Sequence, residues 1–324
     1  MKYTIKNPKM MGDIHTARYN PNIIISILIA IVIYIAYIFI TLIAGMIYGA
    51  INIAQNPEIT QGSYNEIVEK MTDVSSSQDV FLLSLFLMVF VILFVIIEVC
   101  FIEKRPLPTI GLSRKRFIVK YLMGFGVGAL LIAVHMAPSF ITEWNNIAYN
   151  GFSPLVLIFL LAFIIQTASE EIMFRGYLLS SFGHKIGTSW AVILSSLLFA
   201  LFHLINGDAT ILGITSLFFI GLFLGFYMIR TNNLWGAFGI HAAWNFLAGC
   251  SSGIDIGPIA IDYSIISFSE ATNNQDFGIV GDPTLLISIA IFMIGIAFVL
   301  FAGKNKIVKK VEFSVEEIEI SNNH

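Results

Sequence analysis

The sequence has little charge. Only 12% of its 324 residues are Asp, Glu, Lys or Arg, whereas 57% are hydrophobic. Soluble domains are about 25% charged, so this chain has too few charged side chains to cover the surface of a water-soluble globule. The formal net charge of −3 also argues against the strongly basic surface that binds nucleic acid. The composition therefore predicts an integral membrane protein that has the lipid bilayer, and no nucleic acid, as its partner.

Cysteine is scarce as well, since the chain contains only Cys100 and Cys250. They fall near opposite ends of two predicted helices, so they cannot meet in a disulfide. Neither lies in a Cys/His cluster with the spacing of metal ligands. The sequence also contains no internal repeat and no glycine-rich phosphate-binding loop. A disulfide framework, a cysteine-based metal site and a nucleotide-binding loop are therefore not indicated.

Long apolar stretches are what the sequence has in abundance. A helix rises about 1.5 Å per residue and the hydrocarbon layer is about 30 Å thick, so a crossing needs about 20 apolar residues. Eight stretches approach or exceed this length: Ile23–Tyr48, Val80–Ile102, Phe117–Pro138, Pro154–Ser180, Trp190–Ile205, Thr210–Ile229, Trp235–Cys250 and Thr284–Ala302. We therefore expect an all-α polytopic membrane protein with about eight transmembrane helices. The pairs Gly124/Gly128 and Gly221/Gly225 fit the small-residue spacing at which membrane helices pack closely.

The positions of the basic residues predict the orientation. If both termini lie in the cytoplasm, every Lys and Arg except Lys70 and Arg175 falls on the cytoplasmic side. This is the asymmetry that the positive-inside rule describes. We therefore expect an N-in, C-in protein of the cell (plasma) membrane. It would consist of a cytoplasmic N-terminal segment at 1–22, a transmembrane domain at 23–302 and a cytoplasmic tail at 303–324.

The fourth predicted span contains three ionisable residues within the heptapeptide SEEIMFR, at Glu170, Glu171 and Arg175. Each such residue costs at least about 2.5–3.5 kcal/mol on insertion scales, so it indicates a functional site by default. Glu171 and Arg175 are four residues apart on one helix face and can form an ion pair. Glu170 points about 100° away, and we expect it to have no partner in its own helix. An unpaired carboxylate at this depth is a candidate general base.

Two further spans carry polar residues at the same four-residue spacing. His203 follows Phe199 in the fifth span, and Asn245 follows His241 in the seventh. Their estimated depths overlap with that of Glu170, in the cytoplasmic half of the membrane or near its midplane. We therefore expect these residues to converge on one site.

This set suits hydrolysis of a carbonyl compound. Glu170 and His203 can hold and deprotonate a water molecule, and His241 and Asn245 can donate hydrogen bonds to the oxyanion that develops. Glu170, His203 and His241 could instead bind zinc, because two histidines and a glutamate recur in hydrolytic zinc sites. The sequence contains no H-E-x-x-H helix, and an Asn replaces a third strong ligand. We therefore favour a site with no cofactor and keep zinc as the alternative.

The order E-E-x-x-x-R, F-x-x-x-H and H-x-x-x-N on successive membrane helices resembles the CPBP intramembrane proteases. This family, also called Abi or CAAX-protease-like, includes the type II CAAX prenyl endopeptidases and bacteriocin self-immunity proteins. The motifs stand here as Glu170-Glu171…Arg175, Phe199…His203 and His241…Asn245. The resemblance extends over about residues 80–250.

The resemblance implies an intramembrane endopeptidase that hydrolyses a peptide bond of a membrane-associated protein or peptide. Its active site would open towards the cytoplasmic half of the membrane. Family members have been described both as metalloproteases and as metal-independent glutamate-type proteases. By this resemblance, the catalytic residues are Glu170, His203, His241 and Asn245, and the supporting residues are Glu171, Arg175 and Phe199.

Two other functions remain open from the sequence. A bacteriocin-immunity or peptide-binding membrane protein could keep the same fold and polar residues without essential catalysis. A proton-coupled transporter could use the buried carboxylates and histidines as a proton pathway, although the chain shows no duplicated halves. Protection from a peptide toxin that survives Glu170→Ala would favour binding, whereas a proton flux that disappears in Glu170→Gln would favour transport.

Overall fold

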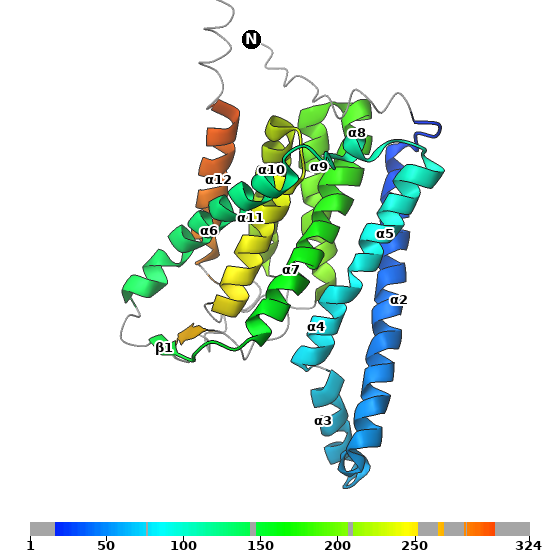
Figure 1. The fold of residues 1–324 in the computed structure, drawn as a ribbon, viewed down its shortest axis with the longest axis vertical. Coiled ribbons are helices and arrows are strands. Elements are labelled where there is room, and N and C mark those ends of the chain that lie inside the picture. The colour runs from blue at the N-terminus through cyan, green and yellow to red at the C-terminus, as the bar shows by residue number, and fades with distance from the viewer. Residues whose placement is uncertain are drawn as a thin grey trace, which may run out of the picture.

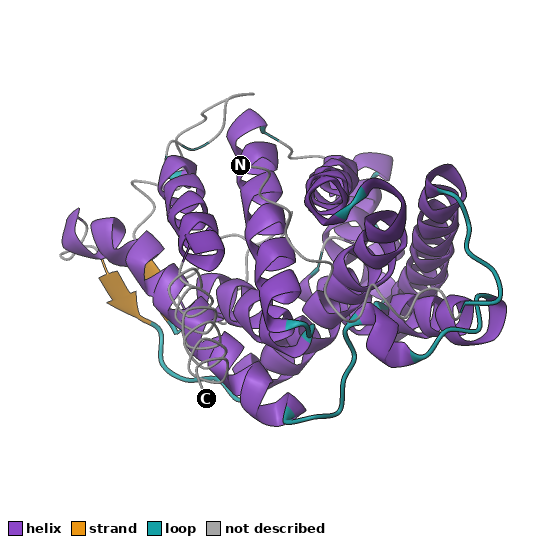
Figure 2. Cartoon of the chain, turned by 90° about the horizontal axis from the view of Figure 1, so that it is seen from above, coloured by secondary structure: helices purple, strands orange, loops and turns teal. Residues whose placement is uncertain are grey.

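The computed structural model describes residues 17–75, 77–142, 147–206, 210–251, 265–268, 282 and 284–301. Helix accounts for nearly all of this part of the chain, and the strands, orange in Figure 2, are short and lie at one edge of the molecule. The predicted all-α class is therefore confirmed. The predicted cytoplasmic tail at 303–324 lies outside the described residues, and the predicted N-terminal segment is described only from residue 17 onwards.

The helices follow the order that the apolar stretches predict. Their bounds are α2 (Ile23–Gln55), η2 (Pro57–Thr60), α3 (Tyr64–Ser75), α4 (Gln78–Leu87), α5 (Val89–Ile97), η3 (Glu98–Ile102), η4 (Leu107–Ile110), α6 (Phe117–Thr142), α7 (Leu155–Glu171), η6 (Ile172–Leu178), α8 (Leu179–Ile186), α9 (Thr188–Phe202), η7 (His203–Asn206), α10 (Ile211–Thr231), α11 (Trp235–Phe246), η8 (Leu247–Ser251) and α12 (Leu285–Phe301). Two strands, β1 (Ile147–Tyr149) and β2 (Ile266–Phe268), pair antiparallel. Each predicted span is helical, and its ends differ from the prediction by a few residues.

Six helical segments in the described part of the chain are long and apolar enough to cross a membrane: Ile23–Gln55, Gln78–Ile102, Phe117–Pro138, Leu155–Ile186, Thr188–Ile205 and Ile211–Thr231. The other two predicted spans are shorter. The α12 helix has 17 residues, and α11 has 12 residues that continue into the five of η8. Both helices pack against these longer segments. The structure thus supports a polytopic membrane protein, and eight crossings stays a prediction for these last two helices.

Hydrogen bonds between connecting segments define the two ends of the helix bundle. At one end, Lys185 Nζ donates to Asn20 Oδ1 over 2.7 Å, and the Leu234 amide donates to the Gly111 carbonyl over 3.0 Å. These contacts join the segments that precede α2, α6, α9 and α11. At the other end, β1 follows α6 and pairs with β2, which precedes α12 (Figure 1). Helices α2, α6, α9 and α11 thus begin at the same end of the bundle, while the N-in, C-in topology stays a prediction from the basic residues.

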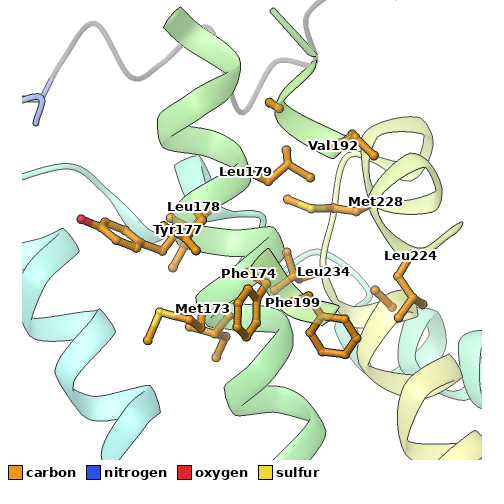
Figure 3. Close-up of a cluster of buried hydrophobic side chains, with 14 of the residues drawn as sticks. Met173, Phe174, Tyr177, Leu178, Leu179, Val192, Phe199, Leu224, Met228 and Leu234 are labelled. Carbon is orange, nitrogen blue, oxygen red and sulfur yellow. The ribbon is translucent and has the colours of Figure 1, made fainter. Parts of the chain in front are cut away.

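The main apolar core surrounds η6, which interrupts the long α7–α8 helix. This segment is a π-helix, and all seven of its residues are buried. In Figure 3 its Phe174 lies beside Phe199 of α9, and the two ring centroids are 5.3 Å apart in an edge-on arrangement. Such π segments inside α-helices occur frequently at functional sites. The helix that carries the predicted carboxylates therefore continues into the centre of the apolar core.

Helix α6 crosses α11 with the two backbones in contact. A Cβ atom at Gly124 would lie 2.1 Å from the Gly236 carbonyl oxygen, and one at Gly239 would lie 2.1 Å from the Tyr121 carbonyl oxygen. The expected packing role of Gly124 is therefore confirmed, because no larger residue leaves room for this approach. The contact fixes the position of α11.

Replacing Gly124 by alanine is expected to lower the free energy of unfolding by about 1–3 kcal/mol, as overpacking does in other tightly packed sites. The measurement is thermal unfolding in detergent. Gly126→Ala on the same helix is the matched control, because a Cβ atom there meets nothing within 4 Å. Equal unfolding temperatures for the two variants would show that the α6–α11 contact does not need glycine at 124.

Candidate active site

Helix α7 and the π-helix η6 carry two pairs of polar residues at four-residue spacing. Gln166 and Glu170 form the first pair, and Glu171 and Arg175 form the second. Residues four apart share a helix face, so each pair can interact along the helix. The two pairs belong to adjacent faces and meet different groups on α11.

The predicted ion pair between Glu171 and Arg175 is present. Arg175 Nη1 lies 2.8 Å from Glu171 Oε1, and both side chains are fully buried. The Arg175 guanidinium carbon also lies 4.1 Å from the centroid of the Phe199 ring, which is the geometry of a cation–π contact. Two groups therefore compensate the charge of Arg175, one on its own helix and one on α9.

His241 of α11 lies between the two carboxylates. Its Nδ1 is 2.9 Å from Glu171 Oε1. A carboxylate only accepts hydrogen bonds, so Nδ1 must carry the hydrogen. Its Nε2 is 3.8 Å from Glu170 Oε2, which is too far for a direct hydrogen bond. Glu171 thus orients the imidazole, and the other ring nitrogen faces Glu170 across a short gap.

Asn245, one turn further along α11, reaches the other pair on α7. Its Nδ2 donates to Gln166 Oε1 over 3.0 Å, and Gln166 Nε2 donates to Glu170 Oε1 over 2.7 Å. The expectation that His241 and Asn245 face the same neighbour is confirmed, because both face α7 and η6.

The expectation that Glu170 has no partner in its own helix is wrong. Gln166, four residues earlier on the same helix, donates to Glu170 Oε1. The signal was nevertheless in the sequence, as an amide four residues before a glutamate in an otherwise apolar helix. Gln166 is therefore a site residue that the sequence reasoning missed.

His203 lies at the end of α9, where the α-helix gives way to the 3₁₀ turn η7. Its Nδ1 is 2.8 Å from the Phe199 carbonyl oxygen, so Nδ1 carries the hydrogen and Nε2 is left as an acceptor. The Phe199 ring contacts His203 at 4.7 Å and His241 at 6.0 Å between centroids. His203 therefore shares an aromatic neighbour with His241, but no hydrogen bond joins it to Glu170 in the described part of the chain.

Several buried polar atoms of this cluster have no hydrogen-bond partner among the described residues. They are Glu170 Oε2, Glu171 Oε2, Arg175 Nε and Arg175 Nη2. Buried polar groups are nearly always hydrogen-bonded, so such exceptions need an explanation. A site that binds water or a polar part of a substrate provides one, since its groups are satisfied when it is occupied.

The alternative of a zinc site was tested against the positions of possible ligands. Within the residues that the structure describes, no group of three or more His, Cys, Asp or Glu side chains is placed to hold a metal ion. The set Glu170, His203 and His241 is thus not gathered as a ligand set.

Residues 152–247 match the family model described as "Type II CAAX prenyl endopeptidase Rce1-like". This part of the chain, called the Rce1-like segment below, is similar to that family. The Rce1-like segment contains all the predicted site residues and Gln166. The family resemblance drawn from the motifs is therefore confirmed, over a shorter range than the expected 80–250.

A curated relative matches over part of the chain. It is "Uncharacterized protein YyaK" from Bacillus subtilis (strain 168), which is 29% identical over 163 residues. The match covers 46% of this chain, and the chain spans about half of the relative's length, 53%. The Rce1-like segment supports a CAAX-type intramembrane protease, while the relative's name specifies no activity.

Proposed function

We propose that this protein is an intramembrane endopeptidase that hydrolyses a peptide bond of a membrane-associated protein or peptide. One observation carries the proposal: six polar residues of α7, η6 and α11 form a connected cluster inside an apolar bundle. Its members are Gln166, Glu170, Glu171, Arg175, His241 and Asn245. The Rce1-like match to the same segment supports this assignment.

In this proposal Glu170 is the general base. Its Oε2 atom is buried, has no hydrogen-bond partner within the described ranges, and faces His241 Nε2 at 3.8 Å. A water molecule bound beside this pair of atoms can donate a hydrogen bond to Oε2 and be deprotonated as its oxygen attacks the scissile carbonyl carbon. His203 assists by accepting a hydrogen bond from the water at Nε2, the nitrogen that its contact with Phe199 leaves free.

His241 and Asn245 stabilise the oxyanion that forms when the water oxygen bonds to the carbonyl carbon. His241 acts at Nε2, the ring nitrogen that faces Glu170, and Asn245 donates from the amide hydrogen that Gln166 does not use. The carbon–nitrogen bond then breaks, and Glu170 returns the proton to the leaving amine. Glu171 and Arg175 support the site by fixing the orientation of the His241 ring.

The test is cleavage of fluorogenic peptides by purified protein in lipid vesicles. Each peptide is offered with a prenyl anchor, with an acyl anchor and without an anchor, so that the result also identifies the substrate class. We expect cleavage of anchored peptides and a decrease of about 10²–10³-fold in kcat in His241→Ala, the usual effect of removing an oxyanion donor. Folded wild-type protein that binds the peptides and cleaves none would contradict the proposal and favour a binding or immunity function.

Metal dependence has its own expected result. We expect the cleavage rate to be unchanged by a strong chelator, because the described residues do not gather three metal ligands. The measurement is the wild-type rate before and after chelation, and after adding zinc back. Activity that chelation removes and zinc restores would contradict this expectation and point to Glu170, His203 and His241 as ligands.

A further inference from the structure

Gln166 connects two residues that the proposed reaction uses for different tasks. Its Nε2 donates to Glu170 Oε1 over 2.7 Å, and its Oε1 accepts from Asn245 Nδ2 over 3.0 Å. Glu170 precedes the π-helix on α7, whereas Asn245 lies on α11, so the amide bridges two helices. The Gln166 side chain is itself buried, with 8% of the residue exposed.

The direction of these hydrogen bonds follows from chemistry. An ionised carboxylate accepts hydrogen bonds and donates none, so Gln166 must present its NH₂ group to Glu170. Its carbonyl oxygen must then face Asn245, and Asn245 must present its NH₂ group to α7. Amide orientation is assigned from such networks, and here each assignment forces the next.

These hydrogen bonds of Gln166 have two consequences for the proposed site. With Oε1 of Glu170 held by Gln166, the other oxygen, Oε2, is left to face the gap beside His241. With one hydrogen of Asn245 Nδ2 used by Gln166, the second is left as a donor on the same nitrogen. A general base and an oxyanion donor need those two orientations.

We propose that Gln166 is a positioning residue that holds the side chains of Glu170 and Asn245 in the orientations needed for reaction, across the contact between α7 and α11. This inference rests on the proposed peptidase function. Gln166 acts through its two neighbours and touches neither the water nor the scissile bond. We call its two hydrogen bonds, to Glu170 and from Asn245, the Gln166 clamp. Small displacements of reacting groups lower a rate by about 10²-fold, so the loss of this clamp should lower kcat.

The kinetic test uses Gln166→Met, which keeps the length of the side chain and removes both hydrogen bonds. We expect kcat to fall about 10²-fold with KM nearly unchanged, because the clamp positions reacting groups and does not bind substrate. Thr167→Val is the matched control. Thr167 is also buried on the same helix, but its hydroxyl donates to the Phe163 carbonyl of its own helix, so kcat should be unchanged.

A double-variant comparison separates positioning from space filling. We expect Asn245→Ala to lower kcat less in the Gln166→Met background than in wild type, because the clamp that aligns Asn245 is already lost. Wild-type kcat in Gln166→Met would overturn the proposal. The proposal would also be overturned if thermal unfolding showed that the loss of kcat equals the loss of folded protein. It would be overturned as well if the effects of Gln166→Met and Asn245→Ala on kcat were fully additive.

A measurement without substrate distinguishes this inference from the peptidase function. In protein labelled with ¹⁵N-glutamine, the Gln166 side-chain amide is identified by its absence in Gln166→Met. We expect this signal to be protected from hydrogen exchange in wild type and to lose protection in Glu170→Ala. Unchanged protection would overturn the clamp whatever the activity. Lost protection in a protein whose wild type cleaves nothing would leave the clamp standing and reject the peptidase proposal.

Discussion

The Glu170→Gln variant is expected to fold and to lower kcat by about 10²–10⁴-fold, the range typical of removing a general base. Glutamine has nearly the same shape as glutamate, but its amide cannot take the proton of an attacking water. The measurement is the initial rate of cleavage of an anchored peptide in vesicles. Peptide binding should be nearly unchanged, because Glu170 acts on the water.

Glu98→Gln is the matched control for this substitution. Glu98 is another buried glutamate within a predicted span, with 6% of the residue exposed. It lies in η3, outside the polar cluster of α7, η6 and α11. We expect its neutralisation to leave kcat unchanged. If Glu170→Gln and Glu98→Gln had the same activity, Glu170 would not be the base.

The second large effect is expected on stability. Replacing Arg175 by methionine should lower the free energy of unfolding by about 3–5 kcal/mol, because it leaves the buried Glu171 carboxylate without its cationic partner. Both partners are fully buried, so water cannot compensate the remaining charge. Thermal unfolding in detergent measures the effect. Cleavage should fall as well, since Glu171 also orients His241.

Two further variants identify the cause of that loss. Arg230→Met removes an exposed arginine at the end of α10 and should unfold as wild type does. The pair Glu171→Met and Arg175→Met should regain part of the stability lost in Arg175→Met alone, because no uncompensated charge stays buried. If the double variant were less stable than Arg175→Met alone, the uncompensated Glu171 carboxylate would not be the cause of the lost stability.

The contact of Glu171 with two partners explains why the two glutamates of the motif differ. Glu171 Oε1 accepts from Arg175 and from His241, so its charge is used to hold structure. Among the described residues, Glu170 accepts from Gln166 at one oxygen, and its other oxygen has no hydrogen-bond partner. The arrangement at Glu170, with one oxygen held and the other available, suits a general base. The ion pair at Glu171 suits a structural role.

Much of the local structure follows from the sequence. Apolar runs predicted all eight helical segments within a few residues, because a helix satisfies its own backbone hydrogen bonds in lipid. The four-residue spacing predicted the Glu171–Arg175 pair and the shared face of His241 and Asn245, since one helical turn is 3.6 residues long. These are properties of single helices, and they depend only on the residues of the helix itself, so the sequence predicts them.

Contacts between helices were predicted less well. The sequence predicted that Glu170 and His203 hold one water molecule, but it did not predict that Gln166 donates to Glu170 or that His241 Nε2 lies 3.8 Å from it. The π-helix at Ile172–Leu178 was not predicted either, because its sequence is as apolar as that of an α-helix. Estimates of depth place residues at one level of the membrane but do not give their angle around each helix.

The sequence by itself determined a helical membrane protein, its motif residues, and which of them share a helix face. Only the tertiary structure decided that α11 presents His241 to Glu171 and Asn245 to Gln166. The physical reason lies in the solvent. Lipid is as apolar as the helix surfaces, so burial alone does not choose which faces meet. The choice depends on close fit, here through Gly124 and Gly239 between α6 and α11, and on the hydrogen bonds that this fit allows.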